Sequence, residues 1–298
     1  MRVTVRVPAS VANLGPGFDC MALALQLQND VIAEERGDDF TLSIEGIEDG
    51  SLHDVRTNLV ARAFVAASES IGAKPTGLQL HCVNRIPMGV GLGSSAAATL
   101  AGVLVAVAVH HAPWDSGAVL DCAASLEGHA DNAAAALLGG LAIAAPEAEA
   151  LSVNVSDELR AVLWLPGHAV ATRDSRQVVP PAIPRADAVF NAARCALLLR
   201  ALTLPDLQSL SSAMQDRWHQ APRFALMPSS AAVLRAALDA GAAGASLAGA
   251  GPAVIALTTS AEEQIAAAMQ TAGDATGEAS RTMVLRPRNF GTRVDVRP

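Results

Sequence analysis

Alternating apolar and polar residues predict extended structure over the first part of the chain. Residues 2–7, 20–34 and 39–45 show this alternation, and so do residues 77–83. Between the last two strands we expect a helix from Thr57, which would cap it, to Ile71, with Gly72 at its end. The chain therefore opens with a sheet and one covering helix.

A second helix is expected to begin at the Ser94–Ser95 pair. Its sequence, AAATLAGVLVAVAV at residues 96–109, is apolar on every face. Such a helix is stable in a water-soluble protein only when other elements cover it completely. We therefore expect it at the centre of a core.

The remaining pattern mixes helices and strands without strict alternation. We expect helices at 115–127 and 132–138, and a strand after Gly139–Gly140. In the second half the pattern predicts strands near 151–155 and 159–165, helices near 184–200, 203–218 and 229–240, a strand–turn–strand around 246–257, a helix near 260–271, and strands at 282–286 and 292–296. This order favours an α+β protein of two lobes over a doubly wound sheet. An Ala/Glu/Pro-rich stretch places the boundary between residues 1–150 and 151–298.

Composition excludes several classes of protein. Of 298 residues 51% are hydrophobic and 17% charged, so the chain is not disordered. The net charge is −8 with no basic run, which argues against nucleic-acid binding. The longest apolar stretches, 96–109 and 133–145, fall short of the ~20 residues that span a membrane. The N-terminus lacks a signal-peptide core, and four scattered cysteines indicate reduced thiols. We expect a cytoplasmic protein.

The most informative segment is a glycine-rich loop before the apolar helix. Glycines at alternate positions leave backbone N–H groups open to an anion, and the helix adds its free N–H groups and positive dipole end. Two serines add hydroxyls that can cap the helix, contact phosphate or bind magnesium. The segment comprises Pro87, Met88, Gly89, Val90, Gly91, Leu92, Gly93, Ser94, Ser95, Ala96 and Ala97.

Two other phosphate-binding motifs fit this segment poorly. A P-loop needs a lysine after its glycines, and the one lysine of the chain, Lys74, lies upstream of the preceding strand. GLGSSA matches the dinucleotide fingerprint, but residues 84–88 separate it from the strand, and helical sequence follows where an acidic strand end is required. A turn without a ligand remains open on this segment alone.

Four blocks of sequence in a fixed order resemble the GHMP small-molecule kinases. They are PASVANLGPGFD at 8–19, PMGVGLGSSAAA at 87–98, LEGHADN at 126–132 and GASLAGAGPAVIAL at 244–257. The first and third are similar to homoserine kinases in particular. The resemblance implies an S5-like N-terminal lobe, a ferredoxin-like C-terminal lobe, a homodimer, and phosphorylation of L-homoserine by ATP.

The same resemblance assigns roles around the nucleotide. It implies that the glycine loop wraps the ATP phosphates, that Ser95 and Glu127 bind Mg²⁺, and that Asn58 lies near the adenine. Magnesium takes few protein oxygens and completes its shell with water and phosphate, which suits this pair. Without the resemblance, the ordinary interpretation of Glu127 is a solvated carboxylate, and that of Asn58 is an exposed residue at a helix start.

An amino-acid substrate needs partners for its carboxylate and its ammonium group. Arginine binds a carboxylate through a two-pronged fork, and the resemblance assigns this role to Arg176 and Arg223. It assigns the ammonium to Asp19 and Asp131. Asn13, His129 and Thr172 are expected as hydrogen-bonding neighbours.

The catalytic group is left open by the sequence. Some relatives in the superfamily use an aspartate base, whereas the resemblance to homoserine kinases places Asn132 near the reacting hydroxyl. Because phosphoryl transfer has a loose transition state, positioning and charge neutralisation supply most of the catalysis. We therefore expect Asn132 to orient the hydroxyl, and Asp131 remains an alternative base.

Three other functions remain to be tested. A different GHMP kinase would act on mevalonate, a sugar or shikimate. A metabolite-binding protein without catalysis would not need Ser95 and Glu127. A nicotinamide-dependent dehydrogenase would use GLGSSA differently.

Overall fold

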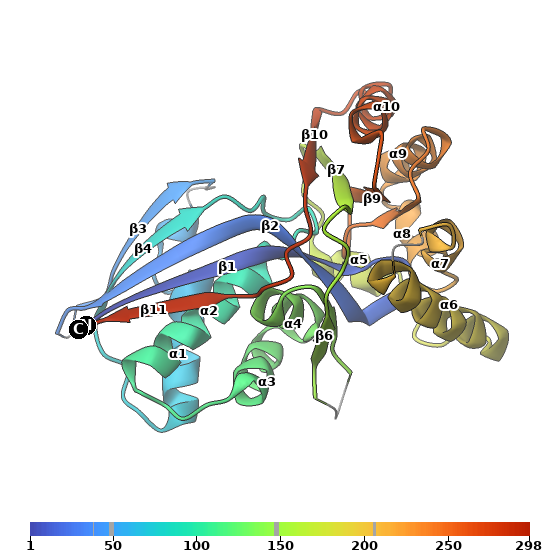
Figure 1. Ribbon diagram of the computed structural model, residues 1–298. Helices are drawn as coiled ribbons and strands as arrows, with labels where there is room; N and C mark the ends of the chain where they lie inside the picture. The colour runs from blue at the N-terminus through green and yellow to red at the C-terminus, as the bar shows by residue number, and fades with distance from the viewer. Residues whose placement is uncertain (38, 48–50, 146–148, 205–206) are drawn as a thin grey trace.

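The computed structural model describes residues 1–298 except 38, 48–50, 146–148 and 205–206. These residues form two lobes, each built on one sheet (Figure 1). The first lobe holds β1 (Arg2–Asn13), β2 (Gly17–Glu35), β3 (Thr41–Gly46), a short 3-10 turn (Ser51–His53), α1 (Leu59–Ile71), β4 (Leu78–Asn84), α2 (Ser94–Val109), α3 (Ser116–Glu127), α4 (Asp131–Leu138), β5 (Leu141–Ile143), β6 (Leu151–Val153) and β11 (Arg293–Arg297). The second holds β7 (Arg160–Pro166), α5 (Thr172–Gln177), α6 (Arg185–Thr203), α7 (Leu210–Ala213), α8 (Gln220–Phe224), α9 (Pro228–Asp239), β8 (Gly244–Leu247), β9 (Val254–Thr258), α10 (Glu262–Asp274) and β10 (Ser280–Leu285).

Helices cover one face of the first sheet. Its strands run in the order β11-β1-β2-β4-β3, with β5 paired to β2 and β6 paired to β5, and all pairs but β3–β4 are antiparallel. The apolar helix α2 lies between α1, α3 and α4 and packs on β1 (Figure 1). Eleven of its residues are buried. The prediction that this helix forms the centre of a core is confirmed.

The second sheet is antiparallel, in the order β10-β7-β9-β8. Helices α9 and α10 pack on one side of it, around the buried Trp164 and Met269. Its other side continues the core of the first lobe through residues such as Leu163 and Ile255. The α+β, two-lobed architecture expected from the sequence is therefore confirmed.

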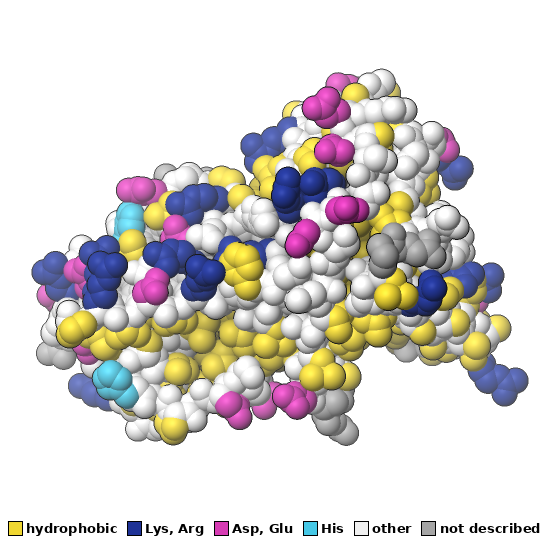
Figure 2. All heavy atoms as spheres, viewed as in Figure 1, with side chains coloured by type: hydrophobic (Ala, Val, Ile, Leu, Met, Phe, Trp, Pro, Cys, Tyr) yellow, Lys and Arg dark blue, Asp and Glu magenta, His cyan; other side chains and the backbone are white. Residues whose placement is uncertain are grey.

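Two strands from the second half of the chain complete the first sheet. β6 pairs with β5, and β11 pairs with β1, where Val3 lies opposite Val296. On the face shown in Figure 2, dark-blue Lys and Arg side chains are interspersed with magenta Asp and Glu side chains. Where β1 and β11 pair, Arg6 is paired with Asp295. This face carries no uniform basic surface. The lobe boundary at residue 150 stays a prediction.

Three local predictions need correction. The predicted helix over 203–218 is wrong: residues 205–206 lie outside the described residues, Thr203 ends α6, and α7 is the only other helical part of the described span. The carboxylate of Asp216 accepts the backbone N–H groups of Trp218, His219 and Gln220, so it starts α8 instead of continuing a helix. The short helix α5 was not predicted. The cap of α1 is Asn58, not Thr57.

No helix within the described ranges is long and apolar enough to cross a membrane. The four cysteines are free thiols, and burial raises the pKa of the Cys82 thiol to about 12.

Candidate active site

The glycine loop between β4 and α2 adopts a conformation that side chains oppose. Gly89, Gly91 and Gly93 have φ angles of 70°, 92° and 70°. A Cβ atom on Gly91 would lie 1.9 Å from the carbonyl oxygen of Ala248, and one on Gly93 would lie 2.4 Å from Ser10 Oγ. Gly93 precedes α2 without a side-chain cap, which leaves N–H groups of the first turn open to a ligand. Free N–H groups at a helix start of this kind are suited to an anion.

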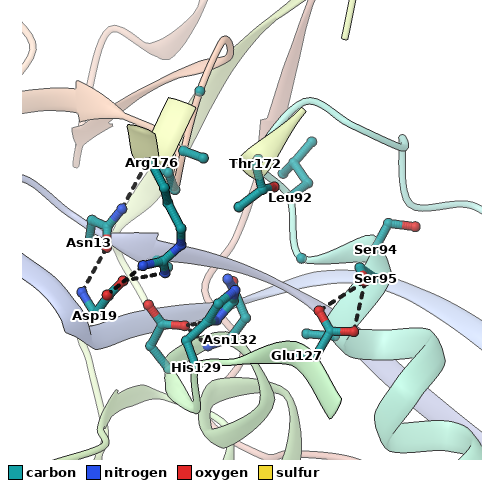
Figure 3. A pocket seen from close by; sticks show the side chains of 18 of the residues that line it. Asn13, Asp19, Leu92, Ser94, Ser95, Glu127, His129, Asn132, Thr172 and Arg176 are labelled. Atoms are coloured by element: carbon teal, nitrogen blue, oxygen red, sulfur yellow. Dashed lines mark hydrogen bonds and ion pairs between the residues drawn. The ribbon is translucent and has the colours of Figure 1, made fainter. Parts of the chain in front are cut away.

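A cavity of about 140 Å³ lies between this loop and the second lobe. Figure 3 shows Ser95 and Glu127 at one end, Asp19 and Arg176 at the other, and His129 and Asn132 between them. The lining residues are Ala12, Asn13, Asp19, Gly89, Gly91, Leu92, Gly93, Ser94, Ser95, Ala96, Glu127, His129, Asp131, Asn132, Thr172, Arg176, Arg223, Gly249, Ala250 and Gly251.

Three oxygen-bearing side chains meet beside the start of α2. Ser95 Oγ lies 2.8 and 2.9 Å from the two carboxylate oxygens of Glu127, and Thr99 Oγ1 donates to the same carboxylate over 2.6 Å. Glu127 ends α3, where Gly128 in the left-handed conformation (φ 82°) terminates the helix. Two hydroxyls of α2 therefore hold the Glu127 carboxylate beside the start of that helix.

At the opposite end, Asp19 and Arg176 form an ion pair through both oxygens. The distances are 2.6 Å for Nη2–Oδ1 and 2.7 Å for Nη1–Oδ2. Asn13 supports Asp19 by accepting its backbone N–H over 3.1 Å, and donates to Gly249 O over 2.8 Å. The hydrogen bonds from Arg176 to Asp19 raise the pKa of Arg176, so the guanidinium stays charged.

The middle of the cavity is lined by the start of α4. Asp131 is 2% exposed, and its Oδ1 accepts from His129 Nδ1 over 2.9 Å and from the backbone N–H of Asn132 over 2.7 Å. The bond to Asp131 raises the pKa of His129. Ser10 Oγ lies 3.0 Å from Asn132 Oδ1. If the serine hydroxyl donates there, the amide NH₂ of Asn132 remains as a donor.

The second arginine, Arg223, is almost fully buried, at 1% exposure. Its Nε donates to Ser175 O over 3.2 Å and its Nη1 donates to His219 Nδ1 over 2.8 Å. Burial, followed by the charge of Arg176, lowers the pKa of Arg223 to about 10. At neutral pH the guanidinium is still a cation.

Most residues expected from the sequence lie together in this cavity, and five do not. Asn58 and Met88 line a neighbouring cavity of about 170 Å³, which shares Gly89, Ser94 and Ser95 with the first. Pro87 and Val90 line a third cavity, and Ala97 is buried in the core. Asn58 is not exposed: its Oδ1 accepts from the N–H groups of Val60 and Ala61.

Sequence reasoning missed three polar residues of the site. Thr99 lies four positions after Ser95, and His219 four positions before Arg223, so helical spacing could have suggested both. Ser10 carries no comparable local signal, because Asn132 is 122 positions away in sequence.

Comparisons with known proteins agree with the fold and the site. The GHMP kinases N-terminal domain matches residues 58–140, and the GHMP kinases C-terminal domain matches residues 198–275. The fold and the loop thus define a GHMP kinase, an ATP-dependent phosphotransferase.

Relatives that match over most of their length show which family of GHMP kinases this chain resembles. A homoserine kinase of Synechococcus sp. is 38% identical, covering 99% of this chain and 98% of the relative. One from Streptomyces coelicolor is 42% identical, covering 86% and 84%. The crystal structure of homoserine kinase from Cytophaga hutchinsonii superposes with a TM-score of 0.87 at 29% identity, covering 99% of this chain and 97% of that one. The chain belongs to the homoserine kinase family.

Proposed function

We propose that this protein transfers the γ-phosphoryl group of ATP to the hydroxyl of L-homoserine, giving ADP and O-phospho-L-homoserine. One observation supports this most strongly. A single cavity joins a loop of free backbone amides to a set of two arginines and two aspartates, which suits a polyphosphate at one end and a zwitterion at the other.

The phosphates of ATP would bind on Gly89–Gly93 and the first turn of α2. The neighbouring cavity, lined by Asn58 and Leu59 as well as Met88, then takes the base. Its walls are largely apolar, as expected for the faces of an adenine ring. The side chain of Asn58 is already fixed by capping α1 and by donating to Leu52 O over 3.0 Å.

Mg²⁺ fits the pair Ser95 and Glu127. Among the described residues no group of three or more His, Cys, Asp or Glu forms a metal cage. One carboxylate and one hydroxyl are enough for magnesium, which keeps waters and phosphate oxygens in its shell. The ion, when bound, neutralises phosphate charge, and Thr99 keeps the Glu127 carboxylate oriented toward Ser95.

The amino-acid groups of homoserine would bind at the other end. Arg223 and Arg176 offer guanidinium donors for the carboxylate, whereas Asp19 and Asp131 accept from the ammonium. Asn13, His129 and Thr172 complete the lining. Because Asp19 and Arg176 are paired with each other in this structure, the substrate has to exchange its own charges for that ion pair.

This orientation places the homoserine hydroxyl near Asn132, facing the loop. The hydroxyl oxygen bonds to the γ-phosphorus while the bond from phosphorus to the β,γ-bridging oxygen breaks and ADP leaves. The hydroxyl proton is lost late, to an oxygen of the transferred phosphoryl group or to water. Asn132, held by Ser10, orients the group without accepting its proton. Asp131 as a base is the alternative, although its Oδ1 already accepts two hydrogen bonds.

The test is ADP release measured with homoserine, mevalonate, galactose and shikimate as acceptors. We expect turnover with homoserine and a product whose phosphate is on the side-chain oxygen. Turnover confined to an acceptor without an amino group would refute the proposal. ATP binding without turnover on any of the four would indicate a binding protein instead.

A further inference from the structure

His219 is a buried histidine that none of the roles above uses. It lies between α7 and α8, is 0% exposed, and is followed one helical turn later by Arg223. Its ring stacks on Phe18 with centroids 5.1 Å apart and an interplanar angle of 21°. A fully buried imidazole of this kind requires a hydrogen-bond partner for each nitrogen.

Both ring nitrogens have such partners. Nδ1 lies 2.8 Å from Arg223 Nη1, and Nε2 lies 2.7 Å from the carbonyl oxygen of Gly15. A guanidinium only donates and a carbonyl only accepts, so Nδ1 is the bare acceptor and Nε2 carries the proton. Burial, against the charge of Asp216, lowers the pKa of His219 to about 4. The neutral ring required by the geometry is therefore the form present at neutral pH.

The bond to Nδ1 fixes which part of Arg223 remains available. Nε is used by Ser175 O, and Nη1 by His219 and, at 3.3 Å, by Gly249 O. Within the described part of the chain, Nη2 has no protein partner, while the side chain lines the cavity. Because the other nitrogens are held, the guanidinium cannot turn without losing their bonds.

The bond from Nε2 reaches the opposite lobe. Gly15 lies in the turn between β1 and β2, with a φ of 89°, and a Cβ there would be 2.1 Å from Met214 O. Asn13 ends β1 just before this turn, and Asp19 lies in β2 just after it. Phe18, on which His219 stacks, also lies 5.3 Å from the guanidinium carbon of Arg223 and 5.6 Å from that of Arg176.

We propose that His219 is a positioning residue that sets the carboxylate specificity of the site. As a neutral imidazole it fixes Arg223 with Nη2 toward the substrate, and links that arginine to the turn that precedes Asp19. This rests on the proposed function, because it concerns the carboxylate of the amino-acid substrate. Substrate discrimination then depends on a residue that does not touch the substrate.

Two substitutions of His219 test its hydrogen bonds to Arg223 and to Gly15 one at a time. In His219→Asn the amide oxygen takes the place of Nδ1 and can still accept from Arg223. In His219→Gln the amide nitrogen takes the place of Nε2, so it keeps the bond to Gly15 and loses the one to Arg223. We expect His219→Gln to raise the KM for homoserine roughly 10- to 100-fold, with kcat and the KM for ATP little changed. His219→Asn is expected to retain most of the wild-type affinity.

A substrate without the carboxylate provides the decisive comparison. For 3-aminopropan-1-ol, which is homoserine lacking that group, kcat/KM should be the same in His219→Gln as in the wild type. The matched control is His110→Asn. His110 stacks on Phe64 and bonds to Ser68 Oγ over 2.9 Å, away from the cavity, so we expect a change in thermal stability alone.

A measurement on the unaltered protein covers the case in which the variants do not fold. ¹⁵N NMR of the imidazole should show a protonated Nε2 and a bare Nδ1 at pH 7. An imidazolium or the other tautomer would overturn the proposal, as would equal losses on both substrates. Absence of homoserine turnover in the wild type would instead refute the proposed function, while leaving the tautomer result intact.

Discussion

Asp19 of β2 and Arg176 of α5 are separated by 157 positions and pair across the cavity through both carboxylate oxygens. Each side chain is about one-third exposed, at 35% and 34%. Solvent therefore weakens the pair, and a ligand that brings one charge of each sign can replace it at modest cost. A ligand with only one charge would leave one of the two residues unpaired.

Replacing Arg176 by lysine tests this exchange. Lysine keeps the charge but not the fork, so we expect the KM for homoserine to rise roughly 10- to 100-fold, the loss of one hydrogen bond to a charged group. Steady-state kinetics check this. Arg173→Lys, at an arginine whose side chain is 84% exposed, is the matched control and should leave the KM unchanged.

Gly91→Ala tests the phosphate loop. The added Cβ would collide with Ala248 O, so the loop must shift, and we expect kcat/KM for ATP to fall by ~100-fold or more. The control is Gly72→Ala, where φ is similarly positive at 80° but nothing lies within 4 Å. That variant should lose only about 1 kcal/mol of stability, from left-handed strain. Normal ATP kinetics in Gly91→Ala would contradict the assignment.

Glu127→Gln tests the magnesium site. With one charged oxygen fewer, we expect the Mg²⁺ concentration for half-maximal activity to increase roughly 10- to 100-fold. Thr99→Val removes only a supporting hydroxyl and should cause a smaller shift in the same direction. Titration of activity with MgCl₂ measures both. Glu263→Gln, on the exposed side of α10, serves as the control, and an unchanged titration in Glu127→Gln would count against the site.

Asp131→Asn distinguishes ammonium binding from base catalysis. If Asp131 holds the ammonium, the variant should mainly raise the KM for homoserine. A collapse of kcat at constant KM would instead identify Asp131 as the base. The structure favours the first outcome, since one oxygen already orients His129 and the start of α4.

The His129–Asp131 pair makes stability depend on pH. Its hydrogen bond raises the folded-state pKa of His129 above the ordinary value of 6.5. The stabilisation is therefore complete below pH 6.5 and is lost as the pH rises through the higher folded-state pKa. We expect the difference in Tm between the wild type and His129→Gln to shrink from pH 6 to pH 9. A difference that grows with pH would exclude this pairing.

Local sequence patterns predicted the elements that carry their own periodicity. The uniformly apolar stretch of α2 located the core, and the alternating glycines located the loop, because both depend on neighbouring residues alone. By contrast, the six residues of α5 are too few for a periodic pattern. In the predicted helix over 203–218, the apolar pattern was given more weight than Asp216, whose carboxylate accepts N–H groups two to four positions later and so starts a new helix.

Among the site residues, too, those with a local sequence motif were predicted and those that depend on tertiary contacts were missed. Ser95, Glu127 and Asp131 lie in recognisable motifs, whereas Ser10 bonds to Asn132 from 122 positions away. His219 has a local spacing to Arg223, but its bond to Gly15 in the other lobe has no signal in the sequence. The pairing of Asp19 with Arg176 also depends on tertiary structure, since neither residue has a local signal for the other. The homodimer that the resemblance implies stays a prediction, because one chain does not test it.

The chain passes between the lobes twice, once from β6 to β7 and again from β10 to β11. On the return, Gln26 N–H bonds to Arg286 O and Arg288 N–H bonds to Ala24 O, so this second passage is fastened to β2. Because the lobes also share one hydrophobic core, these two passages hold the second lobe firmly against the first. The position of Arg176 opposite Asp19 is therefore a property of the whole fold, and not of the short helix α5 alone.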